Sequence, residues 1–198
     1  MCYQDPTLHS LQLSVSLYVL LPYCLLCGYW NILPTKGIRL EVRQMFYDEA
    51  LGSDVDFVES RYDARAYVPL QENHVLAFQS DMSVNTGDVP WSSFPELGNR
   101  LRAYDSKRFT DKVRISQRVE QRIFPFSGKA LERLGFVTFA ETGQVSPAVE
   151  DIRIADWHWS VGAGLRFTML PKEKLNLRID FGFGDDSFNF IVNAREVF

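Results

Sequence analysis

The sequence lacks cysteine over most of its length. Its three cysteines, Cys2, Cys24 and Cys27, all precede Gly28, so neither a disulfide framework nor a thiolate metal site is available to the rest of the chain. Cys24 and Cys27 have the spacing of a metal or redox pair, but no second pair and no neighbouring histidine completes a zinc set. We therefore expect no cofactor and no bound metal.

Positive charge is not in excess either. The chain has 21 Lys and Arg against 25 Asp and Glu, a formal net charge of -4, so nucleic acid is not an expected partner. No Lys or Arg precedes Lys36, whereas a secretory signal peptide begins with basic residues.

A long uninterrupted apolar run is also missing. The apolar stretch 11–26 contains Pro22, and a membrane-spanning helix needs about 20 consecutive apolar residues. Alternation of apolar and polar residues over 11–19 is typical of one short strand. We leave residues 1–30 unassigned, as a possible strand, a mis-called start or a fused foreign segment.

From Asn31 onward, apolar and polar residues alternate in long runs. Aromatic residues make up 14% and apolar residues 46% of the chain, yet the mean hydropathy is only -0.13. A period of two predicts strands with one apolar and one polar face. We therefore predict an all-β fold, an antiparallel meander of about eight long strands. In chain order, the expected strands cover residues 38–47, 58–68, 76–84, 113–123, 134–139, 157–167, 175–183 and 188–198.

The length of the strands and the pattern of their connections favour a transmembrane β-barrel. Strands of about ten residues cross a bilayer at a tilt. Short turns alternating with long loops are typical of an outer-membrane barrel, and the hairpin at Asp185 and Asp186 is the exception to this pattern. The short connections are expected at Pro69, Pro125 and Pro171, and the long ones at Asp48, Gly87 and Gln144.

The arginine-rich polar face leaves one alternative open. In a soluble sandwich this face would be the solvated outside, and a second sheet would cover the apolar face. The last strand favours the barrel, because Phe188, Phe190 and the terminal Phe198 suit the aromatic belt at a membrane interface.

One tetrapeptide in the long polar segment 87–111 requires a separate explanation. Leu101, Arg102, Ala103 and Tyr104 would form the tip of a loop that folds back into the barrel. An arginine inside a barrel is costly unless it is paired, and its planar guanidinium suits a carboxylate. We predict that Arg102 contacts a wall carboxylate from Glu120, Glu141 or Asp180. A solvated loop arginine is the alternative.

From Asn31 to Phe198 the chain resembles the C-terminal half of the barrel in the BamA/TamA superfamily of bacterial surface-antigen proteins. Residues 101–104 stand in place of the family motif Val-Arg-Gly-Phe/Tyr, with Ala103 replacing glycine. Residues 139–143 stand in place of Phe-x-Asp-x-Gly, with Glu141 replacing aspartate. Residues 160–166 and 178–182 match the penultimate strands. The resemblance makes residues 101–104 a latch motif, and Phe188, Phe190, Val192 and Phe198 a C-terminal targeting strand.

The resemblance also carries expectations about the whole protein. Family members have sixteen strands preceded by periplasmic POTRA repeats, so we interpret residues 31–198 as a partial barrel domain, from a fragment, a truncated product or a split gene. The implied function is a non-enzymatic assembly or translocation factor in the outer membrane of a Gram-negative-type bacterium. Its expected partners are membrane lipid, client β-barrels or secreted polypeptides, and periplasmic lipoproteins.

Two further functions remain as alternatives. The chain could belong to a two-partner-secretion-like transporter, or to a surface enzyme whose catalytic domain lies elsewhere. We find no catalytic site within the chain, because none of its serine and histidine candidates lies in a nucleophile-elbow context. These candidates are Ser92, Ser93, His74 and His158.

Overall fold

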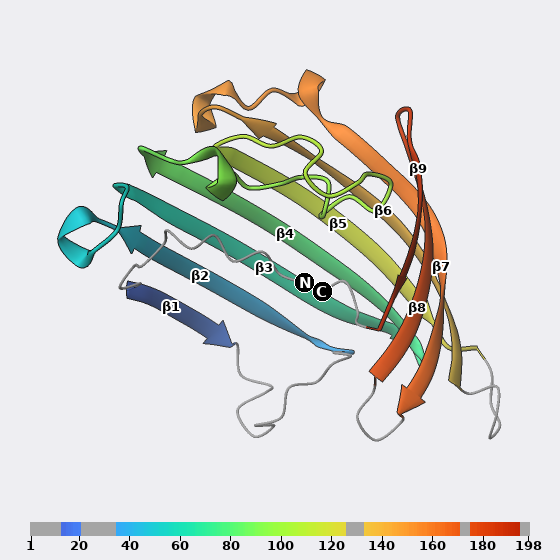
Figure 1. Cartoon of the computed structure of the whole chain (residues 1–198). Coiled ribbons are helices and arrows are strands. Elements are labelled where there is room, and N and C mark those ends of the chain that lie inside the picture. Colours follow the sequence, from blue (N-terminus) through green and yellow to red (C-terminus); the bar gives the residue numbers. More distant parts are fainter. Residues whose placement is uncertain (1–12, 21–34, 126–132, 171–174, 195–198) are drawn as a thin grey trace.

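The computed structural model describes residues 13–20, 35–125, 133–170 and 175–194 as one antiparallel sheet. Its strand order follows the chain from β1 to β9, and the sheet curves around one side (Figure 1). The predicted all-β meander is confirmed. The strands are β1 (Leu13–Leu20), β2 (Gly37–Tyr47), β3 (Phe57–Gln71), β4 (His74–Gly87), β5 (Val113–Ile123), β6 (Leu134–Ser146), β7 (His158–Leu170), β8 (Leu175–Gly184) and β9 (Phe188–Asn193).

Strand β1 lies within the N-terminal segment that the sequence left unassigned. It pairs with β2 from Leu13 opposite Phe46 to Leu20 opposite Arg39. Among the described residues after 34, the structure has the eight strands β2 to β9, in the predicted order.

Two predicted strand ends were wrong. Strand β3 continues past Pro69 to Gln71, and its pairing with β4 shifts register between these two residues. Proline lacks a backbone donor and is tolerated at such irregularities. Strand β6 continues beyond Gln144 to Ser146, because the β5–β6 ladder runs without a break to the pair Val113–Ser146. Phe198 lies outside the described residues.

The sheet has a polar inner face and an apolar outer face. The strand residues of the inner face are largely buried charged and polar side chains, including Asp81, Glu120, Arg122, Arg166 and Asp180. The outer face exposes aliphatic and aromatic side chains such as Leu40, Phe78, Val119, Leu165 and Phe181. This is the reverse of a water-soluble fold, and the described residues contain no second sheet to cover the apolar face. The two faces therefore favour the wall of a barrel over a soluble sandwich.

The long connections gather at one end of the sheet. The β2–β3, β4–β5 and β6–β7 connections lie at the same end as the β8–β9 hairpin, and each long connection contains a short 3-10 turn. Residues 88–112, between β4 and β5, fold back over the sheet (Figure 1). None of the described residues forms a helix long and apolar enough to cross a membrane.

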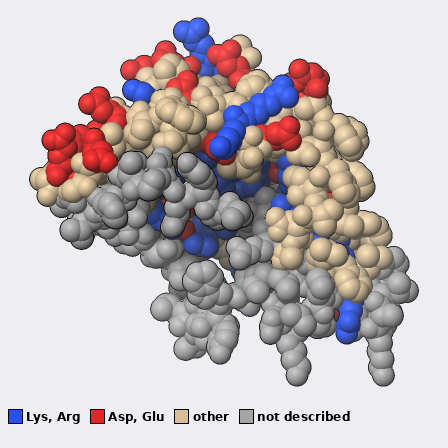
Figure 2. All heavy atoms as spheres, viewed as in Figure 1, with Lys and Arg blue, Asp and Glu red and all other residues tan. Residues whose placement is uncertain are grey.

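Charged side chains are concentrated at two places in the space-filling view. Acidic and basic groups crowd the end that carries the long connections, and basic groups are visible inside the hollow beneath them (Figure 2). Uncharged side chains cover most of the visible flank of β7 and β8 (Figure 2).

Candidate functional site

The loop 88–112 has a tightly hydrogen-bonded tip. The backbone N–H groups of Arg100 and Leu101 donate to the carbonyl of Leu97 at 2.8 and 3.2 Å, and that of Tyr104 donates to the carbonyl of Leu101 at 3.1 Å. Leu97 N–H in turn donates to the carbonyl of Phe109 at 3.0 Å. The tip is thus a compact unit closed by its own backbone, which satisfies polar groups that are buried against the sheet.

A small apolar cluster fixes this tip on the inner face. Leu97, Leu101, Ala103 and Tyr104 are buried together, with Phe109 and Val145 packed against them. Space for Leu97 comes from Gly143 on β6, where an added Cβ would lie 2.8 Å from a methyl carbon of Leu97. Side chains of the loop therefore supply an apolar core that the polar wall does not.

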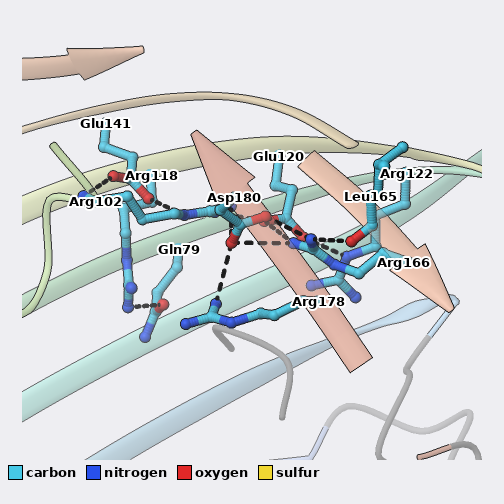
Figure 3. A network of polar contacts seen from close by, with 10 residues as sticks. All are labelled: Gln79, Arg102, Arg118, Glu120, Arg122, Glu141, Leu165, Arg166, Arg178 and Asp180. Atoms are coloured by element: carbon cyan, nitrogen blue, oxygen red, sulfur yellow. Dashed lines mark hydrogen bonds and ion pairs between the residues drawn. The ribbon is translucent and has the colours of Figure 1, made fainter. Parts of the chain in front are cut away.

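Arg102 contacts three carboxylates at once. Its Nε donates to Glu141 Oε1 at 2.8 Å, and its backbone N–H donates to Glu141 Oε2 at 2.6 Å. Its Nη1 donates to Asp180 Oδ2 at 3.3 Å, and its Nη2 donates to Glu120. Only 4% of the Arg102 side chain is exposed. Figure 3 shows these carboxylates converging on the arginine from three strands, β5, β6 and β8.

Further arginines surround the same carboxylates. Arg122 donates to Glu120 at 2.6 Å, Arg166 donates to Asp180 at 2.5 Å, and Arg178 lies 3.5 Å from Asp180 (Figure 3). Burial by itself would lower the pKa of the Arg102 guanidinium, but Glu120, Glu141 and Asp180 outweigh it and raise this pKa above its ordinary value. Arg102 stays charged as one member of a mixed ionic network.

The register of the sheet explains why the loop fits there. Glu120, Phe139, Gly162, Gly182 and Asn189 are successive partners across β5 to β9. The guanidinium of Arg102 stacks on the Phe139 ring, 3.8 Å from its centroid. An added Cβ on Gly182 would lie 2.8 Å from the backbone nitrogen of Ala103. Phe139 thus forms the floor beneath Arg102, and glycine makes room for the following backbone.

Ala103 and Tyr104 extend the contact toward the last two strands. Ala103 N–H donates to Ser160 Oγ on β7 at 3.1 Å. The hydroxyl of Tyr104 lies 3.1 Å from the carbonyl oxygen of Trp159 and 3.1 Å from the carboxylate of Asp185. The loop therefore contacts every strand from β5 to the β8–β9 hairpin.

The structure brings together the residues that the sequence singled out, with differences of detail. Arg102 contacts all three candidate carboxylates, where the sequence predicted one of them. Ala103 does not have a positive φ, so the glycine of the family motif is not required for this turn. Both oxygens of Glu141 are used. That this loop acts as a latch stays a prediction.

Other predicted residues lie away from this cluster. Phe188, Phe190 and Val192 are exposed on the outer face of β9. His158 stacks on Phe109 with ring centroids 3.8 Å apart, and its Nδ1 lies 3.3 Å from Asp185. That Phe188, Phe190 and Val192 form a targeting strand stays a prediction.

Sequence reasoning missed the contributions of Phe139, Ser160 and Gly182 to the binding of the loop. The alternation of β6 offered one signal: Phe139 is two residues before Glu141, so the two side chains lie on the same face of the strand.

Among the described residues, no group of three or more His, Cys, Asp or Glu side chains could hold a metal ion.

The fold of this chain is similar to that of a known protein. A crystal structure of BamA from Haemophilus ducreyi lacking POTRA domains 1–3 is similar to this chain, with a TM-score of 0.65 and 15% sequence identity. The match covers 82% of this chain and 38% of that one, so the chain spans well under half of that protein. None of the curated proteins matches. The family model described as the Omp85 superfamily domain matches residues 30–191, and the chain therefore belongs to the Omp85 superfamily.

Proposed function

We propose that this chain is part of an integral outer-membrane protein of a Gram-negative-type bacterium that assists the insertion of other β-barrel proteins. Its role is to offer a strand edge to an incoming client strand, and it performs no covalent chemistry. The client would add to β9 by β-augmentation, in which backbone hydrogen bonds supply affinity and alternating side chains supply specificity.

The observation that carries this proposal is the geometry of β9. It has six residues and is the last strand of the described sheet, with β8 as its partner on one side. Phe188, Phe190 and Val192 are exposed on its outer face, while Asn189 and Asn193 alternate with them. An edge strand of this kind presents unpaired backbone groups that can template another strand, and its two faces suit a client that also sits between lipid and lumen.

Polypeptide export through the lumen is the second candidate. The loop 88–112 packs over β5 to β8 through Leu97, Leu101 and Arg102. Passage along this part of the inner face would require breaking the Arg102 ion pairs. The seated loop therefore favours a function at the edge of the sheet over one through its interior.

Site-specific photocrosslinking in intact outer membranes tests the proposal. A photoreactive phenylalanine analogue is placed at Val192 on β9, or at Val119 on the outer face of β5 as a matched control. A pulse-labelled outer-membrane barrel serves as the client. We expect crosslinks to the client from Val192 and not from Val119. Equal yields from both positions, or none from Val192, would contradict strand addition at β9.

A further position separates the export function from assembly. A photoreactive group at Arg61 on the inner face should not capture a secreted polypeptide if assembly at β9 is the function. Capture at Arg61 with no capture at Val192 would support export instead.

A further inference from the structure

The loop that carries Arg102 also contacts the β8–β9 hairpin. Tyr104 lies over Gly184 of β8, where an added Cβ would lie 2.7 Å from both the Cζ and the hydroxyl oxygen of the tyrosine. The preceding backbone packs just as closely on Gly182. Glycine at both positions allows the loop to rest directly on the backbone of the penultimate strand.

Hydrogen bonds connect Tyr104 to the turn of the hairpin and to β9. The backbone N–H of Asp185 donates to the Tyr104 hydroxyl oxygen at 3.1 Å. The single hydroxyl hydrogen can then be donated to the carbonyl of Trp159 or to the carboxylate of Asp185, each 3.1 Å away. Asn189 Nδ2, on β9 itself, donates to the carbonyl of Tyr104 at 3.3 Å.

Strand β9 is a short strand at the edge of the described sheet. It is the shortest of the described strands, and its ladder with β8 runs from Arg178–Asn193 to Phe183–Phe188. On its outer face Phe188 and Phe190 are exposed. The rings of Phe188 and Phe190 lie 5.0 and 5.2 Å from those of Phe183 and Phe181 on β8. On the inner face, the Asn189 bond adds a contact from β9 to the loop.

The loop is also anchored in the middle of the sheet. Tyr104 is two residues beyond Arg102, which is fixed by carboxylates on β5, β6 and β8. Movement of β9 away from the sheet would break the Asn189 bond or pull on this buried ionic network. The loop thus relates the position of the edge strand to the middle of the sheet.

We infer that Tyr104 is a positioning residue that holds β9 against β8, with Asp185 and Asn189 as its partners on the hairpin. Release of this contact frees the edge strand while the rest of the sheet stays paired. The inference deepens the proposed function, because β9 is the strand proposed to receive clients, but its test does not depend on a client.

Hydrogen exchange measured by mass spectrometry on the full chain in lipid nanodiscs tests it. Tyr104→Phe removes the hydroxyl contacts and keeps the ring, and Asn189→Ala removes the bond to the Tyr104 carbonyl. Each should raise amide exchange in residues 188–193 about five- to tenfold, the effect of losing one hydrogen bond, with no change in β5 and β6. Matched controls are Tyr62→Phe on the outer face of β3 and Asn193→Ala on the inner side of β9, and neither should change exchange of residues 188–192.

The outcomes separate the positioning role of Tyr104 from the proposed addition of clients at β9. Unchanged β9 exchange in both variants would overturn the inference, and so would an equal rise in every strand, which would indicate general destabilisation. If β9 exchange rises but Val192 captures no client in any variant, the positioning role stands and client addition at β9 falls.

Discussion

The central residue of this chain is an arginine whose charge is shared among several acids. Arg102 uses its Nε, both terminal nitrogens and its backbone N–H on Glu120, Glu141 and Asp180. A planar guanidinium suits this task because its donors point in fixed, separate directions. Exchanging the charges of Arg102 and Glu141 would be a poor test of their pairing, since a carboxylate at 102 would then face Glu120 and Asp180.

Substitution of Arg102 should therefore depend on the shape of the replacement as well as on its charge. Arg102→Ala leaves buried carboxylates short of a counter-charge and should lower the free energy of unfolding by about 3–5 kcal/mol. Arg102→Lys should fall between wild type and Ala, because an ammonium group cannot contact carboxylates on three strands. Urea unfolding in lipid vesicles, followed by tryptophan fluorescence, measures both changes.

Arg108 on the same loop supplies the control. It pairs with Asp186 at 3.1 Å in an exposed position, and such pairs contribute about 0–1 kcal/mol. If Arg108→Ala proved as harmful as Arg102→Ala, the special position of Arg102 in the buried network would be refuted.

At the scale of the strand, the alternation of faces decides where a charge is tolerated. Phe190 is exposed on the outer face of β9, where lipid is expected, and Asn193 lies on the opposite face of the same strand. A lysine on the lipid face of a barrel costs about 2–4 kcal/mol near the bilayer midplane. A lysine toward the lumen can remain hydrated.

Phe190→Lys should accordingly reduce the fraction of protein that inserts into lipid vesicles, whereas Asn193→Lys should leave it near wild type. The inserted fraction can be scored by protection from an added protease. Equal loss of insertion in both variants would argue against the assignment of the two faces.

Alternation made the strands predictable, because each residue's side of the sheet follows from its parity alone. The sequence did not reveal where β3 and β6 end. Pro69 is tolerated beside the register shift of the β3–β4 ladder, and Gln144 is held in β6 by its pairing with Ile115 on β5. The carboxylate partners of Arg102 were predictable as a class, since a buried arginine requires them. The Phe139 floor and the glycines beneath the loop were not, because they depend on the register of four strand pairs at once.

Over the whole molecule, charge is arranged differently from what the net value of -4 suggests. On the inner side of β3, the side chain of Arg61 is 49% exposed while its partner Glu59 is 8% exposed. On β2, Arg39 and Arg43 share the more buried Glu41. In these pairs the guanidinium group is more exposed than the carboxylate, so this part of the inner face presents positive charge to solvent.

The outer surface can be mapped with the tryptophans. Trp159 is the second residue of β7 and is 43% exposed on the outer face, and Trp91, in the loop 88–112, is 82% exposed. In variants whose other tryptophans are replaced by phenylalanine, brominated lipids should quench Trp159 strongly and Trp91 weakly. Iodide in the aqueous phase should show the opposite order. Equal quenching of both residues by lipid would contradict the proposed orientation in the membrane.

The seating of the loop also has a consequence for the order of folding. Arg102 and Asp180 are 78 positions apart, and Tyr104 and Asn189 are 85 apart. Contacts between such distant residues form late, because a long segment must first be ordered. The loop emerges from synthesis before β7, β8 and β9 exist to receive it. Burial of Arg102 therefore requires β8 to have joined β5 and β6 through the intervening β7, and the Asn189 contact of Tyr104 requires β9 to have followed.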